Sequence, residues 1–310
     1  VNPEPNQTNW KMLMAAKERG EETANISIVL GQDPITWMIS GTRIALRFGP
    51  KPKPIDELAI AGGMRGKPID VVKSEDSDIL VPAHAEMVIE GTVALQEPMK
   101  PEGPFGEMFG YLGQYKEENF WMTINTITHR KDPWIMNAFT GMQKGSITAP
   151  FDSLYTQFLR RRIPNLVAYH GPQYSMGVFH MAIDKTAPGQ GLEAGKKVVS
   201  GFGIAKIVIV LDKDVNVLDQ REVIAAVGAR WQPKDAYYVM EEGNGLFTDP
   251  SQPEYGRTSK IVIDATRKWP EEGGREDFPK SNRALLEEGA PDAFAEVNAE
   301  YMDLLRSWMT

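Results

Sequence analysis

Apolar and polar residues alternate along the first half of the chain in a way that predicts short strands separated by turns. The longest alternating run is residues 85–95, AEMVIEGTVAL, and this period of two is typical of a half-buried strand. Shorter strands are expected at residues 26–30, 68–72 and 120–129. Helices are expected at residues 10–20, in the first half of 35–48 and at 56–63. Short strands with intervening turns predict a barrel-like β domain.

The second half of the chain carries longer apolar runs, which predict a different kind of domain. Residues 204–211, IAKIVIVL, are almost wholly apolar, as in a central strand that is covered on both faces. A helix at 153–162, ended before Pro164, is expected to link this half to the β domain. Further strands are expected at 166–170 and 177–183, and further helices at 187–199 and 220–230. This strand–helix order predicts a sandwiched α/β unit.

The C-terminal end has the pattern of an amphipathic helix. Apolar side chains recur at helical spacing in residues 291–309, and they are Phe294, Val297, Tyr301, Leu304, Leu305 and Trp308. A charged, glycine-containing segment separates this stripe from the α/β unit, so the surface that it covers is expected to belong to another subunit. We therefore expect a homo-oligomer, either a dimer or a multiple of one.

The hexapeptide EGPFGE at residues 102–107 is the densest chemical signal. Its proline and glycines exclude a helix, so it is a shaped loop or a bulged strand end that can aim Glu102 and Glu107 into one pocket. Two acids held together in a poor solvent cannot both ionise easily, which suits general-acid work. The ordinary alternative is a solvated turn. Apolar neighbours favour partial burial and a pocket lining, and they are Met99, Phe105, Met108, Phe109 and Tyr111.

Composition limits the class of protein. The 310 residues suffice for two domains, and 25% charged with 42% hydrophobic residues is ordinary for a globular protein. A net charge of −8 gives no electrostatic reason to expect nucleic acid or an anionic membrane as partner. The absence of cysteine excludes disulfides, thiolate chemistry and cysteine-ligated metals. With no apolar run long enough to span a bilayer and no signal-peptide pattern, a cytoplasmic enzyme is expected.

The other motifs in the sequence are weaker indications of function. Asp212 and Asp214 imitate the start of a calcium loop, but Val217 and Val223 stand at its sixth and twelfth positions, so a turn after a buried strand is preferred. The sequence GFG at 201–203 precedes a strand, which is the wrong order for a dinucleotide fingerprint. The histidines show no metal-ligand spacing. A lysine inside an apolar strand, Lys206, is costly unless paired, and it is either an edge lysine that reaches solvent or a functional group.

Two segments carry a family resemblance. VPAHAEMVIEG at 81–91 and PEGPFGEMFGY at 101–111 closely resemble the UbiD-like decarboxylases, which use prenylated flavin mononucleotide (prenylated FMN). The resemblance runs from about Asn9 to about Pro270. It implies an α+β and α/β fold, in which a split β-barrel flavin-binding domain is joined by a linker helix to an α/β sandwich domain. The expected divisions are 1–147 (barrel, without its N-terminal part), 148–163 (linker helix), 164–270 (α/β domain) and 271–310 (linker and C-terminal docking helix).

The resemblance also implies roles for five residues. Glu102 and Glu107 match the glutamates of a Glu–Arg–Glu network, in which Glu107 protonates the substrate carbon after CO2 leaves and Glu102 holds the arginine. Glu57 matches a ligand of the divalent metal, Mn2+ or Mg2+, that bridges to the flavin phosphate. Ser40 matches a residue of the flavin-binding turn, and Lys206 matches a lysine that contacts the phosphate. The resemblance also allows K+ as a further ion.

Part of the expected site has no match. The network arginine would lie upstream of the helix that begins near residue 10, and neither Arg43 nor Arg47 is at the matching place. Asn9 stands where the family has a metal-binding histidine. We therefore expect an N-terminal segment or a separate chain to supply the arginine and further metal ligands, because two glutamates aimed at one pocket repel unless a cation lies between them.

The resemblance implies a reversible, non-oxidative decarboxylase (a carboxy-lyase) that acts on a small unsaturated or (hetero)aromatic carboxylic acid. A non-catalytic or partner-dependent subunit of a UbiD-like carboxylase complex is the alternative. The missing arginine favours this alternative, whereas the intact pair of Glu102 and Glu107 opposes it. Ordinary FMN oxidoreduction on a split barrel is a third possibility, and turnover with NADH would mark it.

Overall fold

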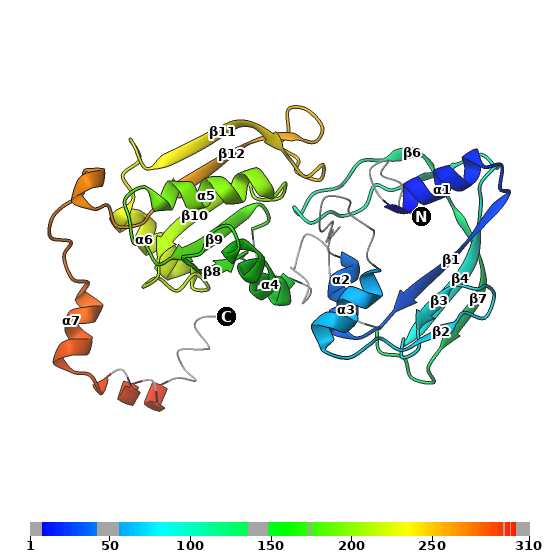
Figure 1. Ribbon diagram of the computed structural model, residues 1–310, viewed down its shortest axis with the longest axis horizontal. Helices are drawn as coiled ribbons and strands as arrows, with labels where there is room; N and C mark the ends of the chain where they lie inside the picture. The colour runs from blue at the N-terminus through cyan, green and yellow to red at the C-terminus, as the bar shows by residue number, and fades with distance from the viewer. Residues whose placement is uncertain are drawn as a thin grey trace.

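The computed structural model describes residues 8–41, 56–135, 148–172, 175–293, 295–297 and 299–301. Their elements form two lobes, one built from residues 8–135 and the other from residues 148–264 (Figure 1). A tail with η1 (Pro270–Glu272) and α7 (Asn282–Gly289) runs out from the far side of the second lobe (Figure 1). The combination of antiparallel sheets in one lobe with helices on both faces of a mixed sheet in the other confirms the predicted α+β and α/β class.

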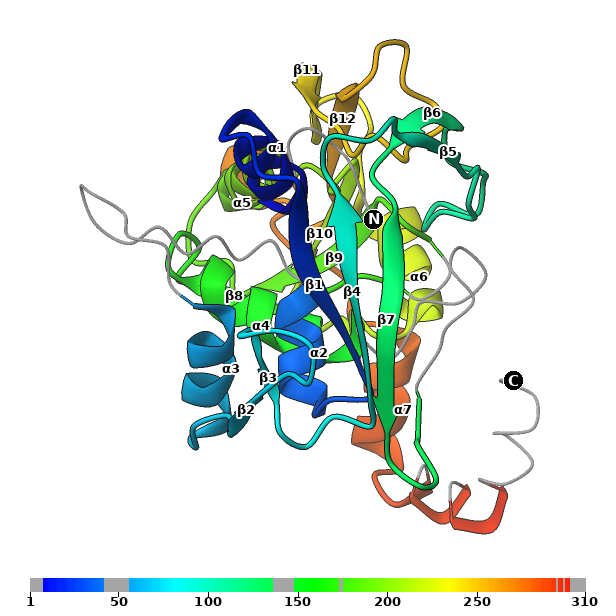
Figure 2. The ribbon, with the colours of Figure 1, turned by 90° about the vertical axis from the view of Figure 1, so that its right-hand side faces the viewer.

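A three-stranded antiparallel sheet forms the centre of the first lobe. Its strands β1 (Thr23–Leu30), β4 (Met87–Ala94) and β7 (Met122–His129) lie in the order β1-β4-β7, and Figure 2 shows them side by side. The long alternating run of the sequence is β4, and a bulge falls between Glu90 and Gly91. There the backbone of β7 is so close that a Cβ on Gly91 would lie 2.1 Å from the carbonyl oxygen of Thr123, so glycine is required.

Helix α1 (Thr8–Glu18) and two short hairpins complete this lobe. The helix packs Leu13 and Ala16 against Val93, Leu95 and Phe120 in a small core. The hairpins are β2 (Val71–Lys73) with β3 (Leu80–Pro82), and β5 (Lys100–Glu102) with β6 (Lys116–Asn119). The strand expected at 68–72 therefore begins later than predicted. Residues 67–70 instead fold back on the preceding helix, where the amide of Lys67 donates to the carbonyl of Gly62 at 3.1 Å.

Helices α2 (Pro34–Gly41) and α3 (Glu57–Arg65) pack on each other at the side of the first lobe that faces the second. Each begins at an aspartate whose side chain accepts backbone N–H groups: Asp33 from Ile35 and Thr36, and Asp56 from Leu58. The helix expected in the first half of 35–48 is thus confirmed, and residues 42–55 lie outside the described part of the chain.

The second lobe is built on a five-stranded mixed sheet. Its order is β11 (Tyr237–Asn244), β12 (Arg257–Asp264), β10 (Ile207–Asp212), β9 (Val178–Ile183) and β8 (Leu166–His170). The three inner strands are parallel, and each outer strand is antiparallel to its neighbour. The apolar run predicted to be a central strand is β10, which has a strand on either side and a helix on either face.

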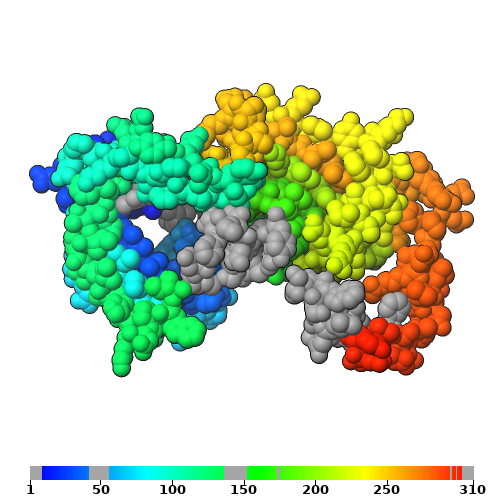
Figure 3. All heavy atoms as spheres, turned by 180° about the vertical axis from the view of Figure 1, so that it is seen from behind, coloured from blue at the N-terminus to red at the C-terminus, as the bar shows by residue number. Residues whose placement is uncertain are grey.

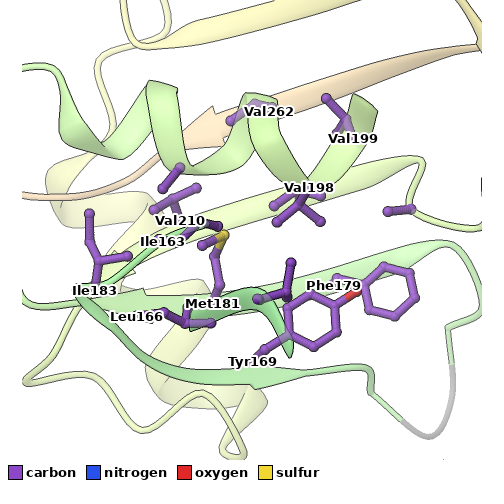
Figure 4. Packing of buried hydrophobic residues seen from close by; sticks show 14 residues of the cluster. Ile163, Leu166, Tyr169, Phe179, Met181, Ile183, Val198, Val199, Val210 and Val262 are labelled. Atoms are coloured by element: carbon purple, nitrogen blue, oxygen red, sulfur yellow. The ribbon is translucent and has the colours of Figure 1, made fainter. Parts of the chain in front are cut away.

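Helices cover both faces of this sheet, as the predicted sandwich requires. Alternate residues of each inner strand point to opposite faces. One face packs Met181 and Val208 against α4 (Thr148–Arg160) and α5 (Gln190–Gly201) in the larger core (Figure 4). The other packs Leu211 against Val223 of α6 (Gln220–Arg230), whose predicted N-cap, Asp219, accepts from the amide of Arg221 at 2.8 Å.

Several elements of the described chain were not predicted. They are the strands β3, β5, β6, β11 and β12 and, at the segment expected to be a linker, η1 and helix α7. The side chain of Ser281 accepts a hydrogen bond from the amide of Ala284 and so starts α7. In the helix expected at 291–309, the described residues from Ala293 to Tyr301 are helical, and Val297 and Tyr301 are 49% and 46% exposed. Outside the described residues lie Phe294, Leu304, Leu305 and Trp308.

Candidate active site

The hairpin of β5 and β6 displays the loop that carries the two predicted acids. Gly103 has a φ of 78°, which is open to glycine, and Gly106 then forms an isolated bridge with Leu112. The amide of Glu107 donates to the carbonyl of Tyr111 at 2.9 Å, and the amide of Gly113 donates to the carbonyl of Phe105 at 2.8 Å. The prediction of a shaped loop or bulged strand end is confirmed, because these bonds fold the segment into a compact turn.

Glu102 ends β5 and is half-buried. Its Oε2 accepts a hydrogen bond from Nδ2 of Asn119, at the end of β6. Lys116 stands directly opposite Glu102 in the ladder, and cross-strand partners carry their side chains on the same face. A cation of this chain therefore lies next to Glu102. The sequence had given no hint of it, because the pairing depends on a bulged register between two strands of three and four residues.

Glu107 is also half-buried, and its side chain lies against the backbone of Gly113. A Cβ added to Gly113 would be 2.8 Å from Cγ and 2.9 Å from Oε1 of Glu107, so the glycine makes room for this carboxylate. The two acids thus have different immediate neighbours, namely Asn119 for Glu102 and Gly113 for Glu107. That they work in one pocket stays a prediction.

The apolar residues around the loop have different environments. Phe105 and Met108 are 59% and 40% exposed, whereas Met99 packs on the core beneath α1. Phe109 reaches the second lobe, where its ring lies 3.3 Å from the position of a Cβ on Gly177. Figure 3 shows the turquoise segment of the loop crossing from the first lobe to the second. The loop with both acids is therefore held at the junction of the two lobes.

Lys206 lies beside this junction. A Cβ on Gly177 would lie 3.5 Å from Cβ of Lys206, and Gly177 accepts the amide N–H of Lys206 at 2.9 Å. The ammonium group donates to Asp249 at 2.8 Å and to the hydroxyl of Ser251. Burial alone would raise the pKa of Asp249, but the hydrogen bonds from Lys206 and Ser251 outweigh it and lower that pKa. Lys206 is thus a paired lysine with polar partners, its side chain is 29% exposed, and its contact with a phosphate stays a prediction.

The other two predicted residues lie on neighbouring helices. Ser40 is exposed on α2, and its hydroxyl donates to the carbonyl of Trp37 at 2.7 Å. Glu57 is the first residue of α3, and partial burial together with the charge of Asp56 raises its pKa. Leu154 of α4 joins the core between these helices, so the elements that carry Ser40 and Glu57 meet the linker helix.

The part of the chain that the structure describes contains neither a metal-binding cluster nor a membrane-spanning helix. No group of three His, Asp or Glu side chains there is arranged to hold a metal ion, and none of the described helices is long and apolar enough to cross a bilayer. Asp212 and Asp214 are bound by Arg230, at 2.9 and 2.8 Å, which supports the prediction of a turn in place of a calcium loop. Arg43 and Arg47 lie outside the described residues.

A cavity of about 360 Å³ lies between the β2–β3 hairpin and the strands β4 and β7, and no predicted site residue lines it. Glu90 lines this cavity. It belongs to the segment 81–91 that carries the family resemblance, but the sequence did not mark it as a site residue. Glu90 is 2% exposed and accepts the amides of Glu75 at 2.9 Å and Asp76 at 2.8 Å. Burial opposes ionisation, but these backbone bonds lower the pKa of Glu90. The carboxylate therefore fixes the acidic turn at 74–78, and both of its oxygens are engaged in hydrogen bonds to that turn.

Comparison with known proteins places these observations in a family. The model of the 3-octaprenyl-4-hydroxybenzoate carboxy-lyase Rift-related domain matches residues 4–143, and that of the 3-octaprenyl-4-hydroxybenzoate carboxy-lyase C-terminal domain matches residues 146–265. An uncharacterized protein of Synechocystis sp. is 30% identical over 286 residues, which are 89% of this chain and 55% of that protein. The chain thus spans about half the length of this curated relative.

Solved structures share the fold. The UbiD-class enzyme HmfF from Pelotomaculum thermopropionicum in complex with FMN is 25% identical with a TM-score of 0.74, covering 89% of this chain and 61% of that one. An evolved dimeric form of HmfF in complex with prFMN is 24% identical with a TM-score of 0.70, covering 90% and 60%. Vanillic acid decarboxylase of Sedimentibacter hydroxybenzoicus, in open form, is 25% identical with a TM-score of 0.75, covering 96% and 61%. Since the two family models together span both lobes, the chain belongs to the UbiD family of 3-octaprenyl-4-hydroxybenzoate carboxy-lyase-related proteins.

Proposed function

We propose that this chain is the greater part of a reversible, non-oxidative decarboxylase that uses prenylated FMN and acts on a small unsaturated or (hetero)aromatic carboxylic acid. The observation that carries the proposal is the loop with Glu102 and Glu107, held at the junction of the two lobes in a chain of the UbiD family. The similar enzyme HmfF in complexes with FMN and prFMN supports the choice of cofactor.

The proposed chemistry divides between the cofactor and the protein. When bound, prenylated FMN supplies an electron sink for the bond that breaks as CO2 departs. Glu107 then donates a proton to the carbon that carried the carboxylate, and in the carboxylation direction it removes that proton. Glu102 pairs with an arginine and holds it between the two acids, which relieves their repulsion. The turn around Gly113 keeps the acid in place.

The described residues fit a flavin phosphate better than a metal. The ammonium of Lys206 gives N–H groups to Asp249 and Ser251 and has a third that a phosphate oxygen can accept, and Ser40 is an exposed hydroxyl on α2. Glu57 is a carboxylate suited to Mn2+ or Mg2+, but it is one ligand where about six oxygens are needed. The described residues do not assemble a metal site, so no step is assigned to the metal or to K+.

We further propose that residues 1–147 form the flavin-binding domain, 148–163 the linker helix, 164–270 the α/β domain and 271–310 the linker and docking helix of a homo-oligomer. Because the chain spans 55% of its relative and about 61% of the solved chains, the network arginine and further metal ligands would come from a segment outside these residues or from a separate chain. A cytoplasmic location, with no nucleic acid or membrane as partner, fits the net charge of −8.

The test is CO2 release by the full natural protein, produced together with a flavin prenyltransferase, from a panel of unsaturated, aryl and heteroaryl acids. Glu107→Gln keeps the size of the side chain and removes the proton donor, so we expect turnover to fall by about 100-fold or more. Glu117→Gln, an exposed acid on β6, is the matched control and should behave as wild type. Near-normal turnover of Glu107→Gln would overturn the assignment.

A non-catalytic or partner-dependent subunit is the second candidate, and the lack of a match for the network arginine in this sequence favours it. The two candidates differ in cofactor binding. Absorbance of the purified protein between about 350 and 550 nm, after production with the prenyltransferase, reports a bound flavin. Absence of that absorbance, with any co-purifying chain present, would favour the non-catalytic subunit, and turnover with NADH would instead indicate ordinary flavin oxidoreduction.

A further inference from the structure

Asn119 combines a polar side chain with an apolar environment. It is 2% exposed at the end of β6, and the next residue, Phe120, belongs to the core beneath α1. A buried amide costs free energy unless its hydrogen-bonding groups are used, so a residue of this kind at the edge of a core indicates a specific partner. The partner of its Nδ2 is Oε2 of Glu102, seventeen residues earlier in the chain.

The orientation of the amide follows from this partner. A carboxylate oxygen accepts hydrogen bonds, so the NH2 group and not the carbonyl of Asn119 must face Glu102. Oδ1 of Asn119 is buried and accepts no hydrogen bond within the described part of the chain. No hydrogen bond to Oδ1 from the described residues therefore helps to set the orientation of the amide. The bond from Nδ2 to Glu102 is the hydrogen bond that orients this buried side chain.

The register of the hairpin places Asn119 and Glu102 on one face. Lys100 is opposite Asn119 and Glu102 is opposite Lys116, so β6 has one more residue than β5 between the two pairs. Lys100 and Glu102 are two residues apart on β5, so their side chains share a face, and Asn119, opposite Lys100, is a diagonal neighbour of Glu102.

We propose that Asn119 is a positioning residue for Glu102: its buried amide fixes the carboxylate in the orientation in which it holds the network cation. The inference rests on the proposed function, because Glu102 has this task only in a decarboxylase. A merely structural role, tying β5 to β6, would alter the stability of the hairpin and leave the chemistry of Glu102 alone.

Two variants of the full natural protein separate these roles. Asn119→Leu removes the amide and keeps an apolar-compatible volume, and Asn119→Asp keeps the shape while replacing the NH2 donor by an oxygen. The control is Asn125→Leu on β7, whose amide donates to the hydroxyl of Thr92 at 3.0 Å away from the loop. Each is measured for kcat and KM of CO2 release at several pH values. Amide hydrogen exchange of residues 103–113 is followed in parallel and needs no activity.

For Asn119→Leu we expect kcat to fall about 10- to 100-fold, the effect of one hydrogen bond to a charged group, with KM within about twofold. In a Glu102→Ala background the same substitution should cause no further loss, because the residue acts through Glu102. Asn119→Asp should regain activity relative to wild type as the pH falls, since a protonated carboxyl can donate to Glu102 again. Exchange in residues 103–113 should rise in both variants and stay unchanged in Asn125→Leu.

Other outcomes overturn the proposal. A kcat near wild type for Asn119→Leu, while Glu102→Ala is impaired, would show that Glu102 needs no positioning by Asn119. An equal loss in the presence and absence of Glu102 would indicate a structural role. If Glu102→Ala and Glu107→Gln both behave as wild type, the proposed function itself fails. If the wild-type protein releases no CO2, amide hydrogen exchange still tests the proposal: unchanged exchange of residues 103–113 in Asn119→Leu would show that Asn119 does not hold Glu102 in place.

Discussion

Gly113→Ala tests the placement of the proposed acid without touching the acid itself. The added Cβ would lie 2.8 Å from Cγ and 2.9 Å from Oε1 of Glu107, whereas ordinary van der Waals contact begins near 3.4 Å. The side chain of Glu107 must therefore move by roughly 0.6 Å, the difference between these distances, and a flexible side chain does so at little cost in stability. Because a misplacement of about 1 Å can cost about 100-fold in rate, we expect kcat to fall about 10- to 100-fold.

The assay is CO2 release by the full natural protein loaded with prenylated FMN, with thermal unfolding measured on the same sample. The midpoint should change by no more than a few degrees, since the shift corresponds to about 1 kcal/mol or less. Gly228→Ala, on α6, is the control because a Cβ there meets nothing within 4 Å. A kcat of wild-type size for Gly113→Ala, with the protein folded, would refute the reasoning that this glycine sets the position of Glu107.

Three further predictions follow from named contacts. In Glu90→Gln an NH2 donor replaces one of the two carboxylate oxygens that accept backbone amides, so the free energy of unfolding should fall by about 1.5–3 kcal/mol in urea titrations at pH 7. This difference from wild type should shrink as the pH drops below about 4, because Glu90, whose pKa is lowered in the folded protein, is then protonated. Lys206→Met should weaken flavin retention in gel filtration. It should also destabilise the second lobe by about 1–3 kcal/mol, discounted for the partly exposed lysine. Stability should then depend less on the protonation of Asp249 at low pH, because Lys206 is one of the donors that lower its pKa. Deleting residues 291–310 should change the oligomer mass in light scattering, and an unchanged mass would contradict docking of that helix on another subunit.

Elements whose burial follows their hydrophobic pattern could be predicted from the sequence. β4 and β10 were found because most of their buried residues are apolar, with Glu90 the charged exception in β4, and α6 because Asp219 caps it at the expected place. β12 was missed for the opposite reason. Its buried positions alternate as a strand requires, but they include Thr258, Lys260 and Asp264, so the period of two cannot be seen in the hydrophobicity. Lys260 is tolerated inside because its ammonium donates to the carbonyls of Val199 and Phe202 at the end of α5.

The candidate site could likewise be predicted only in part from the sequence. The hexapeptide with Glu102 and Glu107 could be recognised because its residues are adjacent in the chain and because only a loop accommodates its glycines and proline. The groups that support it are distant in the sequence: Asn119 reaches Glu102 through a bulged ladder, and Asp249 pairs with Lys206 across 43 residues. No local sequence pattern encodes such a pair, because Asn119 and Asp249, taken alone, have the sequence context of ordinary surface residues.

The shape of the loop and the anchor of its first acid depend on different parts of the chain. A loop closed by its own backbone bonds, such as that between Phe105 and Gly113, retains its shape whichever strand lies beneath it. The anchor of its first acid, however, depends on the register of a hairpin only a few residues long, which one insertion would shift. Residues such as Asn119 are therefore where members of one fold can differ in the strength with which they hold the same acid, and hence in rate, without any change in the acids themselves.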